Sequence, residues 1–382
     1  MDVLLAAGGA SWEQAAIGEI EQADALRLAR RCVDVADLLA VAQTARASAA
    51  LVSLDLPGLD VDVVHRVEAA GVRVVAVEAE PSRCEGLRIR RRAQLGSLED
   101  IALATPSEQL AADVRRAPVV AVWGPAGAPG RSTVALALAS AVAARDVPTV
   151  LVDADTYGGS LGQALGVLDD VSGLVAACRA ANQGRTSEIV DHLLEIDPGL
   201  RLLSGLPRAD MWPQVRPAAL DSVLDHLRAS SEVVVVDCGF CIEVDAGPGA
   251  TRNRTTLQVL EQADAIVLVG RPEPVGLARL VRAAHDLAAV VPHVSPFVVV
   301  NQARPSLGWA EREVRGTLER LTGLDPVAML PHDQSGLDLA AVSGRTPREV
   351  APSSPFVTRI EALAAQLMVT LVPPVALAAR HA

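Results

Sequence analysis

Short aliphatic runs alternate with helical stretches along the first hundred residues, and this alternation predicts an α/β unit. The expected strands are residues 3–7, 50–55 and 72–77, and the expected helices are residues 34–46 and 61–70. Strands that are separated by helices join a mostly parallel sheet, because each crossover returns the chain to the same end of the sheet. We therefore expect residues 1–105 to form one α/β domain.

A second and larger series of aliphatic runs predicts a second sheet. Its expected strands are residues 119–122, 149–152, 200–203, 233–236, 265–269 and 296–300. Most of these runs are continuously aliphatic, which is typical of strands in a parallel sheet whose two faces are both buried. The run at 200–203 is short, and periodicity alone does not distinguish a strand from a buried helix there. We expect residues 117–382 to form this domain and residues 106–116 to be a linker.

The composition supports large aliphatic cores and limits the class of partner. Half of the 382 residues are hydrophobic but only 2% are aromatic, so Val, Leu and Ala must fill the cores. The formal net charge of −12 argues against a general affinity for nucleic acid, which requires basic surface, although one local basic patch stays open. All 34 basic residues are arginine, and we interpret this as the background of a GC-rich genome.

Neither a metal or redox site nor a membrane span is predicted from the cysteines and the apolar segments. Cys238 and Cys241 form a C-x-x-C, but there is no second pair, so we expect plain thiols in a reducing cytoplasm. The chain opens without a signal-peptide pattern and has no clean apolar stretch of about 20 residues. Its apolar end, residues 371–382, contains two prolines; we expect it to pack or bind a partner rather than anchor in a membrane.

One glycine-rich loop carries the strongest chemical signal. Residues 124–133 follow an apolar run and precede a helical run, and this order is typical of a phosphate-binding loop. Gly127 and Gly130 supply tight turns. Arg131 supplies a cation, and Ser132 supplies a hydroxyl for Mg²⁺. Proline and arginine stand where the first glycine and the lysine of the general pattern stand, and an ordinary Gly/Pro turn is the alternative.

Three acidic residues end aliphatic strands after this loop. Asp153 and Asp155 form a D-x-D at the end of one strand, and Asp237 ends another. Carboxylates at the carboxyl ends of strands suit contacts to Mg²⁺ and to an attacking water. Solvated strand ends are the alternative. A dinucleotide fold with Asp153 on a ribose is a rival interpretation, but the glycines do not match the spacing G-x-G-x-x-G.

These motifs resemble those of the MinD/ParA group of deviant Walker A ATPases. The group's loop, K-G-G-x-G-K-[ST], is matched by Ala126, Gly127, Ala128, Pro129, Gly130, Arg131 and Ser132, and Thr133 follows. Its D-x-D and its Walker B acid are matched by Asp153, Asp155 and Asp237. Its adenine-recognising asparagine, and the segment that packs beside the base, are matched by Asn301, Pro331 and Asp333. These elements keep the group's order.

The resemblance implies an ATP-binding protein that uses Mg²⁺ and forms a nucleotide-dependent homodimer. It implies phosphates on Gly127–Thr133 and the base beside Asn301, Pro331 and Asp333. It also implies Mg²⁺ on Ser132, Asp153 and Asp237, with Asp155 positioning the attacking water.

Two departures from the group's loop bear on mechanism. Ala126 stands where the group has a lysine that reaches the partner subunit's phosphates, and Arg271 is a candidate substitute. Arg131 keeps a positive charge, but a guanidinium is wider than an ammonium, and Pro129 lacks an N–H. We therefore expect Mg-ATP to bind and to be hydrolysed slowly or not at all. A non-enzymatic scaffold with a decayed nucleotide site is the alternative.

Within the group, the chain is most similar to the CpaE/TadZ-like branch, which includes actinobacterial proteins described as septum site-determining. That branch has a receiver-like, flavodoxin-like domain before the P-loop NTPase domain. Asp55 lies at the phospho-acceptor position, but Ala6 and Ala7 replace the acidic pair and no lysine exists, so we expect a degenerate, protein-docking receiver. The branch implies a cytoplasmic protein, peripheral at a pole or septum, that positions pilus, secretion or cell-division machinery.

Overall fold

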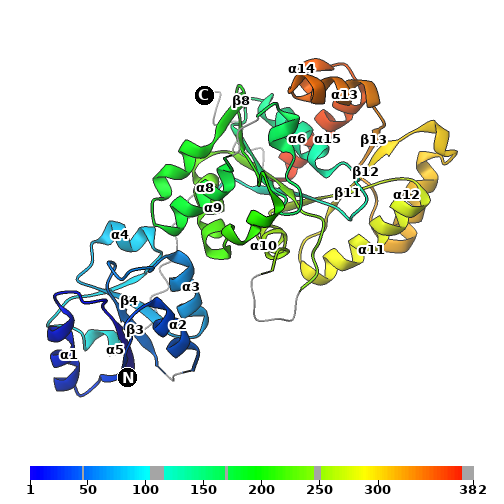
Figure 1. Cartoon of the computed structure of the whole chain (residues 1–382). Helices are drawn as coiled ribbons and strands as arrows, with labels where there is room; N and C mark the ends of the chain where they lie inside the picture. Colours follow the sequence, from blue (N-terminus) through cyan, green and yellow to red (C-terminus); the bar gives the residue numbers. More distant parts are fainter. Residues whose placement is uncertain (45–46, 104–115, 168–170, 245–250, 372–382) are drawn as a thin grey trace. The chain divides into compact units, whose positions relative to one another are not determined.

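The chain folds into two compact units, one built mainly from residues 1–103 and the other mainly from residues 116–371 (Figure 1). The computed structural model describes residues 1–44, 47–103, 116–167, 171–244 and 251–371. The linker expected at 106–116 lies outside the described residues except for its last residue. The apolar end expected to pack or bind a partner lies outside them from residue 372 onward.

The N-terminal unit contains a five-stranded parallel sheet with the order β2-β1-β3-β4-β5. Its strands are β1 (Asp2–Ala6), β2 (Arg27–Arg31), β3 (Ala49–Val52), β4 (Arg73–Val77) and β5 (Arg91–Ala93). Its helices are α1 (Glu13–Gln22), α2 (Val35–Thr44), α3 (Val61–Ala69), α4 (Pro81–Gly86) and α5 (Asp100–Leu103). The order 2-1-3-4-5 is that of flavodoxin-like doubly wound sheets.

The C-terminal unit contains an eight-stranded sheet with the order β13-β12-β11-β6-β10-β7-β9-β8. Its strands are β6 (Val119–Trp123), β7 (Thr149–Ala154), β8 (Leu194–Asp197), β9 (Leu200–Leu203), β10 (Val233–Cys238), β11 (Ala265–Gly270), β12 (Phe297–Ala303) and β13 (Ala328–Pro331). All neighbouring strands run parallel except β8 and β9. The predicted α/β fold with a mostly parallel sheet is confirmed, and the ambiguous run at 200–203 is a strand.

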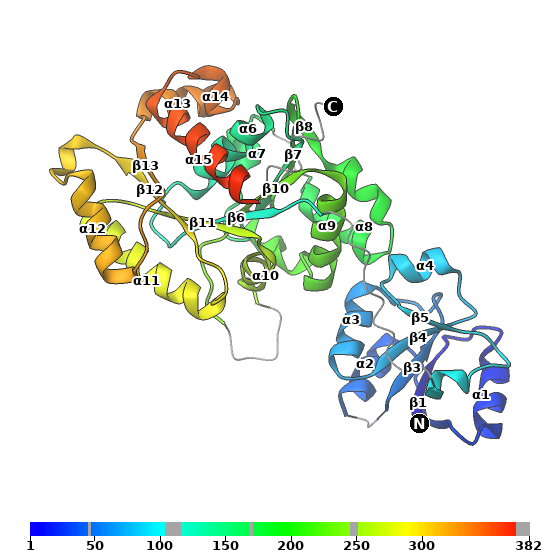
Figure 2. The ribbon, with the colours of Figure 1, turned by 180° about the vertical axis from the view of Figure 1, so that it is seen from behind.

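Helices cover both faces of this second sheet, as Figures 1 and 2 show from opposite sides. The helices are α6 (Arg131–Ala143), α7 (Leu161–Ala164), α8 (Gly173–Asn182), α9 (Pro217–Ser230), α10 (Arg254–Gln262), α11 (Pro274–Val290), α12 (Glu311–Thr322), α13 (Gln334–Ser343), α14 (Pro347–Val350) and α15 (Pro355–Leu371). Short 3₁₀ turns lie at Thr186–His192, Ala209–Gln214 and Pro305–Leu307. No helix in the described part of the chain is long and apolar enough to cross a membrane.

Helix α6 is the most deeply buried helix that bears on the site. Every residue from Val134 to Ala143 is buried, and the helix packs between the sheet and α15. A helix that is apolar on all sides has no surface to offer to water, so it must lie inside the core. The burial of α6 fixes the position of its first turn, and with it the position of the glycine-rich loop that precedes it.

Candidate functional site

Strand register brings the loop and two of the acidic residues together at the carboxyl ends of the central strands. In the sheet β10 lies between β6 and β7, and Asp237 of β10 is in register with both Asp153 of β7 and Val122 of β6. The glycine-rich loop leaves β6 one residue later, after Trp123. The carboxyl ends of parallel strands are where α/β sheets place their ligands.

The loop has the tight backbone that its glycines predict. Gly127 and Gly130 have φ values of 110° and 87°, and Ala128 between them has a φ of 51°. Gly124 is required for a different reason, because a Cβ there would lie 2.2 Å from the carbonyl oxygen of Val269 on β11. This close approach of Gly124 to β11 holds the start of the loop against the sheet. The sequence alone does not reveal it.

The first turn of α6 directly follows the loop and contains Arg131, Ser132 and Thr133. The residue before the helix is Gly130, which has no side chain, and no other side chain caps this end. The first N–H groups of α6 are therefore left without a capping partner. Free N–H groups together with the positive end of the helix dipole favour an anion at this place.

Arg131 uses most of its donors within the protein. Its Nη1 lies 3.3 Å from the carbonyl oxygens of both Gly124 and Pro125, and its Nε donates to the carbonyl of Cys238 at 3.1 Å. Its Nη2 pairs with Asp155 Oδ2 at 3.4 Å, and both side chains are largely buried. A guanidinium has five N–H groups, so these contacts leave Arg131 little capacity to bind a phosphate without rearrangement.

The carboxylates of Asp153 and Asp237 are buried, and their contacts do not fully offset the cost of burying their charge. Asp237 is 0% exposed, and the nearby Ser132 hydroxyl and Arg131 charge only partly offset the burial of its carboxylate. Burial, reinforced by the negative charge of Asp153, raises the pKa of Asp237 well above its ordinary value. Burial also raises the pKa of Asp153 to about 6, although the N–H groups of Leu161 and Asp155 donate to it. A bound cation would neutralise this pair.

These residues fit Mg²⁺ better than they fit a metal held by protein ligands alone. No group of three or more His, Cys, Asp or Glu side chains in the described ranges forms a metal site. Magnesium is ordinarily held by one or two carboxylates together with phosphates and water. Asp153 and Asp237 supply such carboxylates, and Ser132 lies on the adjacent first turn of α6.

The three residues that the resemblance assigns to base recognition make different contacts in the structure. At the end of β12, the buried Asn301 donates from Nδ2 to the carbonyl of Pro129 at 2.8 Å, so its amide holds the loop. Pro331 pairs with Ala303 at the end of β13. Asp333 caps α13 by accepting from an N–H of that helix at 3.0 Å. Neither Pro331 nor Asp333 makes a hydrogen bond to the loop in the described part of the chain.

Two further arginines contact the carbonyl groups of the loop. The sequence points to one of them, Arg271, as a candidate substitute for the missing lysine, but not to the other. Arg279 of α11 donates to the carbonyl of Ala126 at 3.3 Å. Arg271, after β11, lies 3.5 Å from the carbonyl of Gly127 and forms an ion pair with Glu273 at 2.7 Å. An exposed helix arginine about 150 residues after the loop gives no sequence signal of this contact.

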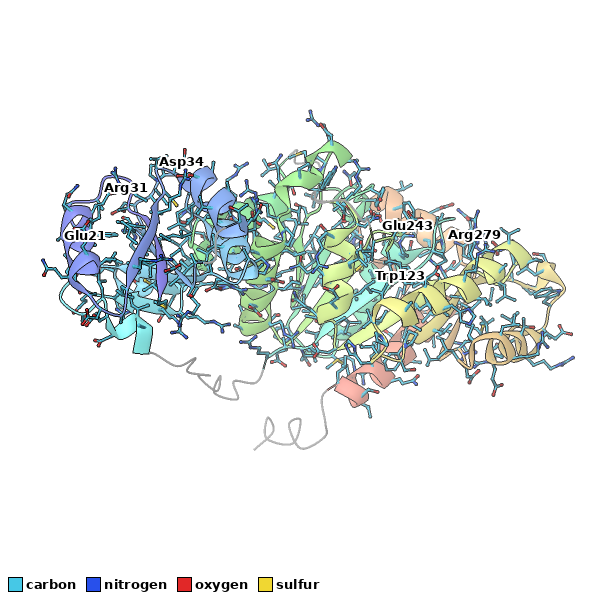
Figure 3. All side chains as sticks on the ribbon, turned by 90° about the horizontal axis from the view of Figure 1, so that it is seen from below. Glu21, Arg31, Asp34, Trp123, Glu243 and Arg279 are labelled. Carbon is cyan, nitrogen blue, oxygen red and sulfur yellow. The ribbon has the colours of Figure 1, made fainter. Side chains whose placement is uncertain are left out.

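A groove of about 540 Å³ runs between α11 and the segment after β10, beside the start of the loop. Its lining includes Trp123, Ala126, Phe240, Glu243 and Arg279. Figure 3 labels three of these side chains in this part of the surface. The Trp123 indole is 2% exposed and its Nε1 donates to the carbonyl of Phe240 at 3.2 Å, which fixes the groove's inner wall.

In the N-terminal unit, the candidate phospho-acceptor Asp55 lies on the surface after β3. Its side chain is 81% exposed and pairs with Arg83 at 2.9 Å. Ala6 and Ala7, which stand in place of the expected acidic pair, lie at the end of β1 and directly after it. An exposed ion pair of this kind is worth little and does not build a site.

No family profile matches the chain, and no curated protein is significantly similar to it. Solved structures are similar in fold. A ParA family ATPase from Chlorobium tepidum TLS superposes with a TM-score of 0.55 at 20% identity, covering 66% of this chain and 99% of that structure. The cell division ATPase MinD from Pyrococcus furiosus gives a TM-score of 0.53 at 18% identity, covering 67% of this chain and 100% of that structure.

About two thirds of the chain has the fold of the ParA and MinD ATPases. MinD from Pyrococcus horikoshii OT3, solved as a complex with Mg-ADP, is also similar, with a TM-score of 0.52 at 17% identity over 66% of this chain and 96% of that structure. At this identity the ParA/MinD likeness establishes the fold, and function must be argued from the site itself.

Proposed function

We propose that the C-terminal unit, residues 117–382, binds ATP with Mg²⁺ and acts as a nucleotide-dependent spatial regulator. The observation that carries this proposal is the buried, in-register pair Asp153 and Asp237 beside a glycine-rich loop and the open first turn of α6. The buried carboxylates of Asp153 and Asp237, both with raised pKa values, favour a cation in this place. The Mg-ADP complex of a structure with the same fold supports this choice of ligand.

In this proposal the loop N–H groups and the first turn of α6 bind the phosphates. Ser132, Asp153 and Asp237 hold Mg²⁺, which neutralises phosphate charge. Asn301 holds the loop at Pro129 and contacts the base. Pro331 and Asp333 line the base side at the end of β13 and the start of α13.

Hydrolysis is slow or absent in this proposal because the residues that would assist it are engaged elsewhere. Asp155, the residue proposed to position water, accepts from Arg131 and from the N–H of Tyr157 at 2.8 Å. Arg131 in turn bridges the loop and the end of β10. A missing cation at the transferred phosphate costs about 10³–10⁵ in rate. A turnover equal to that of lysine-bearing relatives would contradict this part.

Calorimetric titration with Mg-ATP tests the binding proposal. We expect Asp237→Ala and Arg131→Ala each to weaken binding by about tenfold or more, because they remove a metal ligand and a loop cation. The matched controls are Asp286→Ala and Arg282→Ala, which change exposed residues of α11. Unchanged affinity in both site variants would contradict the proposed roles.

A non-enzymatic scaffold is the second candidate, because the Arg131 donors are already engaged within the protein. The same titration separates the two functions. A scaffold with a decayed site shows no heat of binding with Mg-ATP in the wild-type protein, whereas the regulator binds.

For the N-terminal unit we propose a degenerate receiver, residues 1–105, that docks other proteins. Its strand order is consistent with a receiver, and its exposed Asp55 has no acidic neighbours after β1. We expect no perturbation of Asp55 by the phosphate analogue BeF₃⁻ in an NMR titration with Mg²⁺. Saturable shifts centred on Asp55 would show a working phospho-acceptor instead.

The wider biological setting remains part of the proposal. We propose a CpaE/TadZ-like protein that is cytoplasmic or peripheral at a pole or septum, forms a nucleotide-dependent homodimer and positions pilus, secretion or cell-division machinery. The fold shared with a cell division ATPase supports a positioning role in general terms. Pilus or secretion ATPase genes beside this gene would favour the pilus role over the septum.

A further inference from the structure

Side chains from α11 and the end of β11 hold the first half of the glycine-rich loop by its carbonyl groups. Arg279 Nη1 lies 3.3 Å from the carbonyl oxygen of Ala126. Arg271 Nη1 lies 3.5 Å from the carbonyl oxygen of Gly127, at the limit of hydrogen bonding. Both donors are charged, and hydrogen bonds from charged donors are stronger than those from neutral ones.

Side chains from β12 hold the second half of the loop in the same manner. Asn301 Nδ2 donates to the carbonyl of Pro129 at 2.8 Å, and Gln302 Nε2 lies 3.4 Å from the carbonyl oxygen of Ala128. Four consecutive carbonyl groups, those of residues 126–129, therefore each contact a side-chain donor that comes from more than 140 residues later in the chain.

Peptide geometry connects these contacts to anion binding. The loop's peptide bonds are trans, so each carbonyl and the N–H of the following residue point in opposite directions. Donors that hold the carbonyls of residues 126, 127 and 129 therefore turn the N–H groups of Gly127, Ala128 and Gly130 away from themselves. None of these three N–H groups donates to another residue in the described ranges, so they remain available for an anion.

The Arg279 guanidinium lies directly against the backbone of Gly127. A Cβ on Gly127 would lie 2.1 Å from Arg279 Nη1, well inside contact distance. Ala128, which is not glycine, is held at a φ of 51°, a conformation that costs an ordinary residue about 1 kcal/mol. The tethering side chains offset this strain.

We propose that Arg279, assisted by Arg271, is a positioning residue that presents the loop N–H groups to the phosphates. This inference rests on the proposed nucleotide binding. Arg279 acts in its own chain and through the loop backbone rather than by touching the nucleotide. This positioning would explain how the loop keeps an anion-binding form although Ala126 and Arg131 stand where the ParA/MinD group has lysines.

The first test measures Mg-ADP affinity by calorimetry in the full-length chain. We expect Arg279→Ala to weaken binding by about tenfold. We expect Arg279→Lys to restore part of the loss, because an ammonium can donate to one carbonyl but not as a fork. Arg282→Ala, one helical turn further along α11 and on the same groove, should bind like the wild type. Wild-type affinity in Arg279→Ala overturns the proposal.

The second test does not depend on nucleotide. Glycine-selective ¹⁵N relaxation in the nucleotide-free protein reports the order parameters of Gly127 and Gly130, which we expect to fall in Arg279→Ala and not in Arg282→Ala. If wild-type protein binds no nucleotide while these order parameters fall, the nucleotide proposal fails and the tether stands as a loop contact only. Unchanged order parameters in Arg279→Ala overturn the tether itself.

Discussion

At the scale of single residues, Asp237 has the least favourable environment in the site. Its carboxylate is fully buried beside Asp153, and the nearby Ser132 hydroxyl and Arg131 charge only partly offset that burial. Its raised pKa means that the folded protein holds this proton more tightly than the unfolded chain. The free energy of unfolding therefore falls as the pH rises through that pKa, and the folded protein without a cation is least stable in alkaline solution.

Asp237→Asn should reverse this loss. We expect the variant to raise the melting temperature of the nucleotide-free protein by about 2–4 °C at pH 8, measured by calorimetry in the presence of a chelator. The gain should be smaller at pH 5, closer to the ordinary pKa of aspartate, because the unfolded wild-type chain then also begins to take up this proton. Asp286→Asn, on the exposed surface of α11, should change neither value. An equal gain at both pH values would contradict the account.

At the scale of elements, the sequence predicts strands at the centre of a sheet well and strands at its edges poorly. Strands β10 and β11 are almost wholly aliphatic because both faces are buried, and their patterns are clear. Strand β2 was not predicted: its sequence Arg27–Arg31 contains three arginines, and it lies at a sheet edge, where no burial pattern is imposed. Edge strand β8, Leu194–Asp197, was missed for the same reason.

The same limit applies to the site. The order of strand, loop and helix predicts the loop, and strand-ending acids make Asp153 and Asp237 candidates, which strand register places opposite each other. The contact between Arg279 and the loop could not be predicted, because it depends on which strand lies beside β6. The strand order places β11 there, and α11 follows it.

Helix α15 offers a direct measure of how much its packing contributes to stability. Phe356 is 0% exposed in the core that also buries α6, whereas Val369 of the same helix is 71% exposed. We expect Phe356→Ala to lower the free energy of unfolding by about 3–5 kcal/mol in denaturant titration. Val369→Ala should change it by less than about 0.5 kcal/mol. Similar losses in both variants would show that α15 does not pack as described.

At the scale of the whole molecule, the net charge of −12 disfavours a general affinity for nucleic acid. We expect no complex with a 60-base-pair duplex at about 150 mM salt in a mobility-shift assay, with or without Mg-ATP, because phosphate contacts require clustered basic surface. A shift that weakens steeply with salt would reveal a local basic patch that binds nucleic acid.

The arginine at position 131 also determines how this protein can be detected. Reagents that locate ATP sites by acylating the amine beside the phosphates require a lysine, and this chain has none. A guanidinium stays protonated at any physiological pH and resists such acyl transfer. Chemical surveys that rely on amine labelling would therefore overlook this protein even if it binds ATP tightly.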